Sequence, residues 1–355
     1  MATIKNLRKK IDSIDTKMVA LLNERANISK SIGDSKLKDN QSIYAPNREK
    51  EVLDRIRALN KGPMSADALQ AIYREIMSSS LALENLSPVA HLGTKGSFTH
   101  MAAAKIFGSL VPYRGYASIQ EVFDSVEDGD CSYGVVPIEN SIEGAVTHTF
   151  DLLVESELKI CAQRKMKIAH CLISSAKSLK SIKNVYSNPN ALGQCRHWLA
   201  RNLPTAGQIS IASTTEAVQK IIGKKDSAAI ASSLAAQVYD VPVLRRNIQD
   251  VAHNTTRFLV IAKHDVPPTG KDRTSILFSI KDKVGALHAM LTPFYRNKIN
   301  LTKIESRPSK KRAWDYYFFV DIEGHRKDKK VQRALNQLEG MCKYLKILGS
   351  YPIIE

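Results

Sequence analysis

The segment from Ile4 to Lys38 constrains the fold more than any other part of the chain. It contains no proline, and its only glycine is Gly33. Apolar residues recur alternately three and four positions apart at Ile4, Leu7, Ile11, Ile14, Met18 and Leu21, and again at Ile28 and Ile32. This spacing predicts one long α-helix with an apolar seam like that of a coiled coil.

Charged residues interrupt this seam. Arg25 occupies the position after Leu21 where an apolar residue is due, and Lys36 follows 11 positions later, about 20° away around the helix. Two cations on a face meant for burial are costly unless an anion meets them; alternatively, both side chains extend from the seam edge into solvent. Arg8 lies about 100° from Arg25, so we expect it to point towards a neighbouring subunit.

Two shorter helices are expected next. Pro46 suits a first helical turn, and Arg48 and Glu49 share the inner face of the turn that follows them. A third helix begins after Ser65 and carries these residues along one side: Leu69, Ile72, Ile76, Ser80, Leu83 and Glu84. About 85 residues arranged in this way bury little apolar surface on their own, so we expect an intertwined dimer.

The region 89–262 alternates strand-like and helix-like segments. This alternation predicts an α/β fold with mainly parallel strands, whose ligands bind beyond the carboxyl ends of the strands. The loop 93–99 joins a strand to a helix N-terminus, which suits an anion. It lacks the G-x-G-x-x-G pattern, so no dinucleotide cofactor is expected. Pro137 is expected to end a strand just before Glu139, Asn140 and Ser141.

Polar side chains cluster in segments 136–146, 187–195 and 253–261. The last of these places two hydroxyls and Arg257 just ahead of an apolar run typical of a buried strand. The hydroxyls could donate a proton or a hydrogen bond, and Arg257 could bind a carboxylate. Taken alone, the segment also fits a polar turn before a core strand.

The tail, from Thr274 to Tyr351, shows the order strand, helix, strand, strand, helix, strand, which predicts a ferredoxin-like module. Gly285 precedes its first helix, where the backbone could approach a ligand carboxylate. The alternative is an ordinary loop glycine with a surface salt bridge nearby.

Composition excludes several classes of protein. The net charge of +17 is typical of nucleic-acid binders, but the basic residues are spread along the chain and no nucleic-acid motif is present, so we expect no nucleic-acid partner. Such a charge also steers small anions to clefts. The five cysteines are odd in number and lack a C-x-x-C pair, so we expect free thiols and no metal site. Without a long apolar run or a secretory signal, a cytoplasmic protein with no membrane partner is expected.

The helical part resembles the all-helical chorismate mutase family. The resemblance rests on Leu7-Arg8, Arg25, Lys36, Arg48-Glu49, Ser80 and Glu84. It implies that Arg25, Lys36, Arg48 and Arg8 from a second copy hold the carboxylates and ether oxygen of chorismate, while Glu49 and Ser80 bind its hydroxyl and nearby polar atoms. Lys36 and Glu84 would be catalytic, and Glu84 must be protonated to donate to the ether oxygen.

The three polar segments resemble, in order and spacing, the signatures of prephenate dehydratases. The resemblance implies two α/β lobes around a cleft and a Thr256 that protonates or hydrogen-bonds the leaving hydroxyl of prephenate. The residues implied to orient the substrate are Ser97, Asn140, Ser141, Ser187 and Gln194. Arg257 either holds a carboxylate or braces the loop; Glu139 is an acid or a cap; Phe258 is expected in the core.

The tail resembles the ACT regulatory domain attached to these dehydratases. The resemblance implies phenylalanine binding, at an interface between two modules, by Gly285, Ala286, Leu287, Glu305, Ser306, Arg307 and Pro308. The expected architecture is multidomain: an all-α intertwined helical mutase domain (1–86), an α/β two-lobed dehydratase domain (89–265) and an α+β ferredoxin-like ACT domain (272–355). The expected protein is a cofactor-free homodimer or larger homo-oligomer acting on chorismate and prephenate, with phenylalanine as inhibitor. The alternative is a non-catalytic amino-acid sensor or solute-binding protein.

Overall fold

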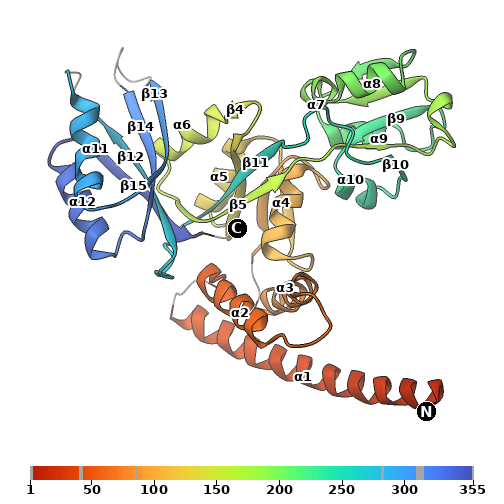
Figure 1. The fold of residues 1–355 in the computed structure, drawn as a ribbon, viewed down its shortest axis with the longest axis horizontal. Coiled ribbons are helices and arrows are strands. Elements are labelled where there is room, and N and C mark those ends of the chain that lie inside the picture. Colours follow the sequence, from red (N-terminus) through yellow and green to blue (C-terminus); the bar gives the residue numbers. More distant parts are fainter. Residues whose placement is uncertain (1–2, 40–42, 85–86, 281–283, 309–315, 354–355) are drawn as a thin grey trace. The chain divides into compact units, whose positions relative to one another are not determined.

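The structure is a computed structural model that describes residues 3–39, 43–84, 87–280, 284–308 and 316–353. The chain divides into two compact units (Figure 1). Unit 1 comprises Met1–Pro88 and Phe107–Pro112, and unit 2 comprises Val89–Ile106 and Tyr113–Glu355. None of the helices in the described ranges is long and apolar enough to cross a membrane.

Unit 1 contains the predicted helices α1 (Ile4–Lys38), α2 (Pro46–Leu59) and α3 (Ala66–Leu83). Pro46 stands in the first turn of α2, and the Ser65 hydroxyl caps α3 by accepting a hydrogen bond from the Ala68 backbone N–H at 3.2 Å. The C-terminal part of α1 packs beside α2 and α3, whereas its N-terminal part extends well past them (Figure 1).

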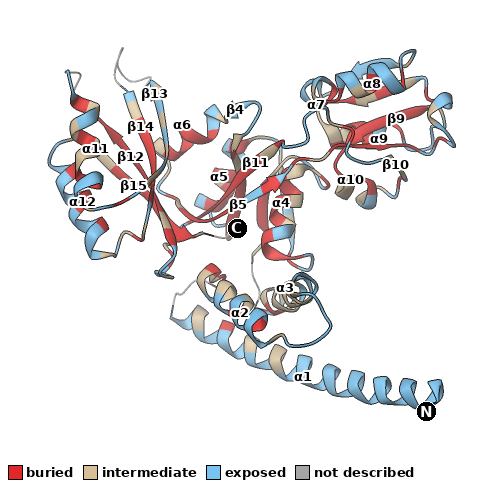
Figure 2. Cartoon of the chain, in the orientation of Figure 1, coloured by how far each residue is buried: buried red, intermediate tan, exposed pale blue. Residues whose placement is uncertain are grey.

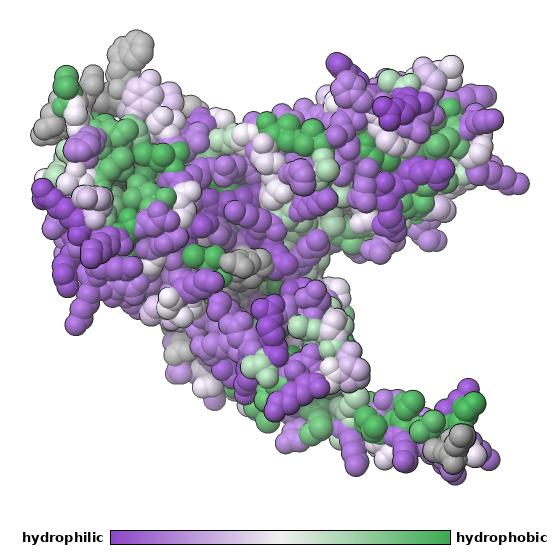
Figure 3. Space-filling view, viewed as in Figure 1, coloured by the Kyte–Doolittle hydropathy of each residue, from purple (hydrophilic) through white to green (hydrophobic). Residues whose placement is uncertain are grey.

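The apolar seam of α1 is largely bare in the single chain. Ile11, Met18 and Leu21 are 57%, 51% and 63% exposed. Figure 2 shows the helix as mostly exposed, and Figure 3 shows hydrophobic side chains gathered along it. A contiguous apolar strip of this kind marks an interaction surface.

Unit 2 begins with a mixed sheet in the order β2-β1-β3-β11-β5, with β4 paired to β3. Its strands are β1 (Val89–Leu92), β2 (Tyr113–Tyr116), β3 (Tyr133–Asn140), β4 (Gly144–Ala145), β5 (Lys159–Lys167) and β11 (Thr255–Ala262). The helices associated with it are α4 (Phe98–Phe107), α5 (Ile119–Glu127) and α6 (Thr147–Glu155). We call this part lobe 1.

The next segments form a second mixed sheet, in the order β10-β6-β9-β7-β8, which we call lobe 2. Its strands are β6 (Cys171–Ile173), β7 (Asn184–Ser187), β8 (Gly207–Ser210), β9 (Ser227–Ala231) and β10 (Val243–Arg245). Its helices are η1 (Leu179–Ser181), α7 (Pro189–Gln194), α8 (Arg196–Asn202), α9 (Thr214–Lys220) and α10 (Ser233–Val238).

The prediction of mainly parallel strands was wrong. β1 is parallel to β2 and β3, but β11 returns between β3 and β5 and runs antiparallel to both. Lobe 2 likewise combines parallel pairs around β7 with antiparallel pairs around β6. The late strand β11 causes the difference in lobe 1, because it enters the sheet from lobe 2.

The sequence suggested that Pro137 ends its strand, and this prediction was wrong. β3 continues to Asn140, and the register between β3 and β11 shifts between Arg257 and Phe258, opposite the proline. A bulge at this point tolerates a residue without a backbone N–H. The continued pairing sets Asn140 opposite Thr256 and Glu139 opposite Arg257.

The tail adopts the predicted ferredoxin-like topology, with an antiparallel sheet in the order β13-β14-β12-β15. Its elements are β12 (Asp272–Ser279), α11 (Ala286–Arg296), β13 (Leu301–Pro308), β14 (Tyr316–Glu323), α12 (Lys329–Glu339) and β15 (Tyr344–Pro352). α11 and α12 cover one face of this sheet (Figure 1). Apolar residues from the strands also enter the core cluster of lobe 1.

Candidate active sites

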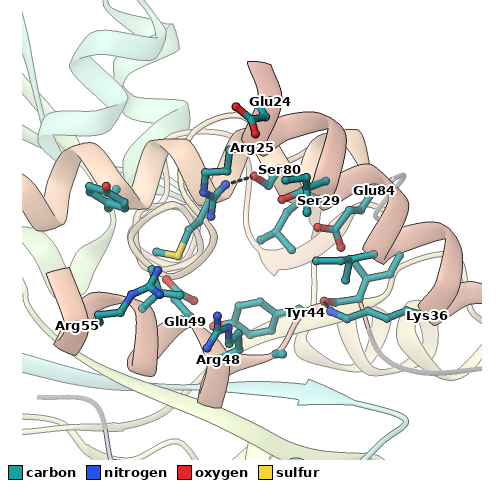
Figure 4. Close-up of a pocket in the computed structure, with 18 of the residues that line it drawn as sticks. Glu24, Arg25, Ser29, Lys36, Tyr44, Arg48, Glu49, Arg55, Ser80 and Glu84 are labelled. Carbon is teal, nitrogen blue, oxygen red and sulfur yellow. Dashed lines mark hydrogen bonds between the residues drawn. The ribbon is translucent and has the colours of Figure 1, made fainter. Parts of the chain in front are cut away.

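A cavity of about 450 Å³ lies among α1, α2 and α3 of unit 1. Arg25, Lys36, Arg48, Glu49, Ser80 and Glu84 all line it. Figure 4 shows their side chains around one space, with α1 contributing two of the cations. Spacing along α1 brings Arg25 and Lys36 to the same face, as expected from the helical repeat.

Among the described residues, the two cations that α1 contributes to this cavity have few hydrogen-bond partners. Arg25 donates to the Ser80 hydroxyl at 2.6 Å, and Ser80 in turn donates to the Ile76 carbonyl at 3.0 Å. The Lys36 ammonium donates to the Ile43 carbonyl at 2.7 Å. Because guanidinium and ammonium groups carry several donors each, both retain hydrogens that an anionic ligand could accept.

Glu84 is the least satisfied polar group of the cavity. It is 8% exposed, and its Oε2 has no hydrogen-bond partner among the described residues. Burial raises the pKa of Glu84, against the smaller opposing influence of Lys36 and Arg25. Gly33 provides the space for this side chain, since a Cβ there would lie 2.7 Å from the Glu84 Cγ. The site therefore stabilises the protonated form of this carboxyl more than solvent does.

Arg8 lies outside this cavity, exposed on α1 and 17 residues before Arg25, about 26 Å away at the rise of an α-helix. Sequence reasoning also missed several polar residues that line the cavity: Glu24, Ser29, Tyr44, Arg55 and Tyr73. Arg55 could have been found, because it follows Arg48 by two helical turns and so shares its face of α2.

A second cavity, of about 220 Å³, lies in unit 2 and is lined from both lobes. Thr256, Asn140, Gln194 and Phe258 line it. Asn140 Nδ2 donates to Thr256 Oγ1 at 2.7 Å, while Asn140 Oδ1 accepts the backbone N–H groups of Ile142 and Glu143 at 2.9 and 3.0 Å. These two N–H donors fix the orientation of the Asn140 amide, so the Thr256 oxygen accepts and its O–H remains available to a ligand.

A chain of side chains continues from this pair across the cavity. Asn140 donates to Asn254 Oδ1 at 2.7 Å, and Asn254 donates to Gln194 Oε1 at 3.0 Å. His170 Nε2 lies 2.9 Å from the same oxygen. Because Gln194 Oε1 only accepts, His170 carries its proton on Nε2.

His170 was not among the residues expected from the sequence. Burial lowers its pKa, which favours the neutral ring, and its buried Nδ1 lacks a hydrogen-bond partner within the described ranges. The ring that lines the cavity therefore has one unpaired nitrogen. Other lining residues that sequence reasoning missed are Phe98, Thr99, Asn188, Asn190, Thr214 and Asn254. Asn254 could have been found two positions before Thr256, on the same face of an extended strand.

Other expected residues have structural contacts instead of positions on the cavity wall. Ser97 caps α4 by accepting the His100 N–H at 3.1 Å, and the buried Ser187 donates to the Ile230 carbonyl at 2.7 Å. The Ser141 hydroxyl donates to the His253 carbonyl at 3.3 Å and accepts the Thr255 backbone N–H at 2.9 Å. Phe258 is 2% exposed and thus belongs to the core, although it also lines the cavity.

Arg257 and Glu139 point away from the cavity, towards the tail module. Arg257 pairs with Asp321 at 2.6 Å, and Glu139 pairs with Lys303 at 2.7 Å. Arg257 was expected either to hold a substrate carboxylate or to brace the loop, and these contacts favour the bracing role.

The segments expected to bind an amino acid lie in the tail module. Gly285 has φ of 76° and stands at the N-cap of α11, followed by the buried Ala286 and half-buried Leu287. Along β13, Glu305 and Arg307 face the same side, while Ser306 and Pro308 are exposed on the other. Arg307 lies 3.7 Å from Asp151 of α6.

Comparisons with known proteins match each part of the chain. Family models match for chorismate mutase type II over residues 7–85, prephenate dehydratase over residues 89–266 and the ACT domain over residues 274–340. A bifunctional chorismate mutase/prephenate dehydratase of Aquifex aeolicus is 48% identical, over 99% of this chain and 98% of the relative.

Solved structures match unit 2. The prephenate dehydratase of Arthrobacter aurescens, in complex with L-Phe, has a TM-score of 0.69 and 30% identity, covering 75% of this chain and 90% of that one. A quorum-quenching acylase, GqqA, also has a TM-score of 0.69, at 26% identity, covering 75% of this chain and 98% of that one. This fold alone therefore does not specify one chemistry.

Together, the helical cavity, the two-lobed α/β part and the ferredoxin-like module define an enzyme that joins an isomerase to a lyase and to an ACT domain. The chain belongs to the bifunctional chorismate mutase/prephenate dehydratase family. It is thus an enzyme with two activities, and the multidomain architecture predicted from the sequence is confirmed.

Proposed function

We propose that the α1–α3 cavity rearranges chorismate to prephenate and that the cleft between lobes 1 and 2 converts prephenate to phenylpyruvate for phenylalanine biosynthesis. The observation that carries the proposal is the pairing of two cavities with different chemistry in one chain: one lined by cations beside a buried carboxyl, the other by hydrogen-bonded amides and a hydroxyl. The proposed domain bounds are 1–86, 89–265 and 272–355.

The mutase step is a unimolecular rearrangement, so the protein needs only to hold a compact conformer and stabilise charge at the breaking ether bond. In the proposal, Arg25 and Arg48 hold the carboxylates, and Ser80 and Glu49 bind nearby polar atoms of the substrate. Lys36 and protonated Glu84 donate to the ether oxygen. The raised pKa of Glu84 supports this role, because only the protonated carboxyl can donate.

The dehydratase step removes the ring hydroxyl and the ring carboxylate together, giving phenylpyruvate, carbon dioxide and water and taking up one proton. We assign the hydrogen bond to the departing hydroxyl to Thr256. The Asn140 amide, which occupies the lone pair of Thr256 Oγ1, supports this role by leaving the O–H free. A threonine is a weak acid, so positioning and electrostatics supply most of the effect.

Regulation by phenylalanine is proposed at the ACT module, with Gly285, Ala286 and Leu287 beside the helix N-terminus and residues 305–308 on β13. The left-handed backbone at Gly285 and the N-terminus of α11 suit a ligand carboxylate. The L-Phe complex of the Arthrobacter aurescens protein supports the choice of ligand.

The quaternary structure is proposed to be a homodimer or larger assembly in which α1 seams pair and Arg8 of one copy reaches the cavity of the other. Ile14→Glu, in the seam, should weaken this dimer and make mutase activity depend on protein concentration. Thr16→Glu, on the opposite face of α1, is the matched control. Sedimentation velocity showing an unchanged dimer for Ile14→Glu would contradict the seam interface.

One experiment tests the two-step activity. The full chain receives chorismate alone, and phenylpyruvate is followed with and without phenylalanine. We expect phenylpyruvate to accumulate after transient prephenate, and phenylalanine to suppress its formation. Accumulation of prephenate without phenylpyruvate would refute the dehydratase assignment, and unchanged chorismate would refute the mutase assignment.

A further inference from the structure

The strands that carry the proposed dehydratase residues have two functional faces. Thr256 pairs with Asn140, and Arg257 pairs with Glu139, in the register of β11 and β3. Because successive side chains of a strand point to opposite faces, Thr256 and Asn140 face the cavity while Arg257 and Glu139 face the ACT sheet. The ACT module therefore contacts the immediate neighbours of both polar residues.

The contact at Arg257 is buried and makes several hydrogen bonds. Arg257 Nη1 donates to Asp321 of β14 at 2.6 Å, Nη2 donates to the Tyr351 hydroxyl of β15 at 3.0 Å, and Nε donates to Gln163 of β5 at 2.7 Å. Ser275 of β12 also donates to Asp321, at 2.5 Å. Arg257 and Asp321 are each 7% exposed. A buried pair of this kind is costly to break, because the remaining charge loses its partner.

The contact at Glu139 is less buried and comes from a different strand. Lys303 of β13 donates to Glu139 at 2.7 Å, and the two side chains are 15% and 41% exposed. The Lys303 ammonium also lies 5.3 Å from the centre of the Phe150 ring. Lys303 precedes Glu305 by two residues and faces the same side of β13. This ion pair thus joins the proposed phenylalanine-binding strand to β3.

Apolar packing joins the module to lobe 1 around these ion pairs. Leu277, Phe319 and Leu348 of the ACT sheet share one core cluster with Val136 and other residues of lobe 1. Gly349 approaches β5 so closely that a Cβ would lie 2.2 Å from the Ile160 carbonyl oxygen. Because packed cores resist continuous deformation, a displaced ACT strand would displace the strands of lobe 1.

We propose that the ACT module acts on the dehydratase residues through these two ion pairs, and that the pairs have different tasks. Arg257–Asp321 anchors β11 and so holds Thr256 in place, whether or not phenylalanine is bound. Glu139–Lys303 links β13 to β3 and transmits the state of the ACT module to Asn140. Arg257 is a positioning residue that acts through Thr256, whereas Glu139 acts through Asn140 only when phenylalanine is bound. The inference rests on the proposed roles of those two residues.

The anchor is tested with Asp321→Asn, which keeps the shape and removes the charge. Misplacement of a reacting group by about 1 Å can lower a rate about 100-fold, so we expect dehydratase kcat to fall at least about tenfold with little change in KM. Mutase kcat in the same preparation should remain at the parent value. Dehydratase kcat within about twofold of the parent would overturn the anchoring role.

The link is tested with Lys303→Met, whose side chain can still pack on Phe150. Allosteric couplings are typically worth a 5- to 150-fold change in affinity, so the phenylalanine concentration for half-inhibition should rise about tenfold or more, with uninhibited kcat near the parent value. Lys329→Met, on the exposed start of α12, is the matched control. Calorimetry should show that phenylalanine still binds Lys303→Met, and loss of binding would overturn the linking role.

The double variant Glu139→Lys with Lys303→Glu exchanges the two charges. It distinguishes an effect of the ion pair from an effect of either residue alone. Each single change should weaken inhibition, and the swap should restore it. Parent-like inhibition in both single variants, or a swap as insensitive as the singles, would overturn the linking role. Thr256→Ala in the same assay tests the proposed catalytic residue independently, so failure of one proposal is distinguishable from failure of the other.

Discussion

The two cavities organise their polar residues in opposite ways. In the mutase cavity, Arg25 contacts Ser80 and Lys36 contacts a backbone carbonyl, while one Glu84 oxygen has no partner in the described part of the chain. In the dehydratase cleft, Asn140, Thr256, Asn254 and Gln194 are joined in one hydrogen-bonded chain. The mutase cavity therefore presents positive charge that an anion can bind, whereas the dehydratase cleft presents a hydroxyl donor that the protein has already oriented.

The secondary structure explains this difference. Helical side chains that share a face are separated by a turn or more, so α1, α2 and α3 each contribute isolated groups to the cavity. Paired strands bring side chains directly opposite one another, as at Thr256 and Asn140. We expect the dehydratase step to depend steeply on one hydroxyl and the mutase step to depend on a field shared by several cations.

The largest expected effect is that of Thr256→Ala on the dehydratase. Loss of the positioned donor should lower kcat by about 10²- to 10⁴-fold, the range typical of general acid groups, and leave mutase kcat unchanged. Rates of prephenate consumption and chorismate consumption are measured on the same preparation. Thr255→Ala, which removes the neighbouring hydroxyl outside the cavity lining, is the control. Near-parent turnover by Thr256→Ala would contradict the claim that the dehydratase step depends steeply on one hydroxyl.

A smaller loss is expected for single cations of the mutase cavity. Lys36→Met should lower mutase kcat/KM by about 10²- to 10³-fold, as for removal of one transition-state donor. Dehydratase turnover of supplied prephenate should not change. Lys38→Met, in the same last turn but exposed, is the control. Equal losses in the two variants would mean that general charge, and not the placement of Lys36, governs the site.

In the mutase cavity, the pairing of Arg25 and Lys36 was predictable from the sequence because both lie on α1, whereas the groups on α2 and α3 were expected from the family resemblance. The helical repeat alone brought Arg25 and Lys36 together, and the same reasoning would have added Arg55. In the dehydratase cleft, Asn140 and Thr256 were found through sequence segments that the register of β3 and β11 brings side by side.

The remaining site features depend on contacts between distant segments. His170 carries no local signal, because its role follows from Gln194, which lies on a different element of lobe 2. The direction of Arg257 follows from Asp321, on a strand of the ACT sheet. The fold class was predictable from the alternation of elements, but the antiparallel insertion of β11 depends on which strands neighbour it in space.

Gly33→Ala should produce a still smaller effect, and only in the mutase. The new Cβ would displace the Glu84 side chain, and overpacking of this kind costs about 1–3 kcal/mol, so we expect mutase kcat to fall about tenfold. Alanine also favours a helix by about 1 kcal/mol over glycine, so thermal stability should change little. Ser35→Ala, exposed on the same helix, is the control. A parent-like mutase rate would show that the position of Glu84 is not critical.

The subtlest expected effect is a change in the shape of the mutase pH profile. Burial raises the pKa of Glu84, so the protonated, donating form persists above the ordinary carboxyl range. As pH rises through that pKa, the donor is lost and kcat should fall, whereas the dehydratase profile should lack this limb. Glu84→Gln retains an N–H donor that does not titrate, so its profile should be flat.

Of the two cations that lower the pKa of Glu84, Lys36 has the larger influence. The residual activity of Lys36→Met should therefore decline at higher pH than that of the parent. A limb that persists in Glu84→Gln, or that does not move in Lys36→Met, would assign the titration to another group.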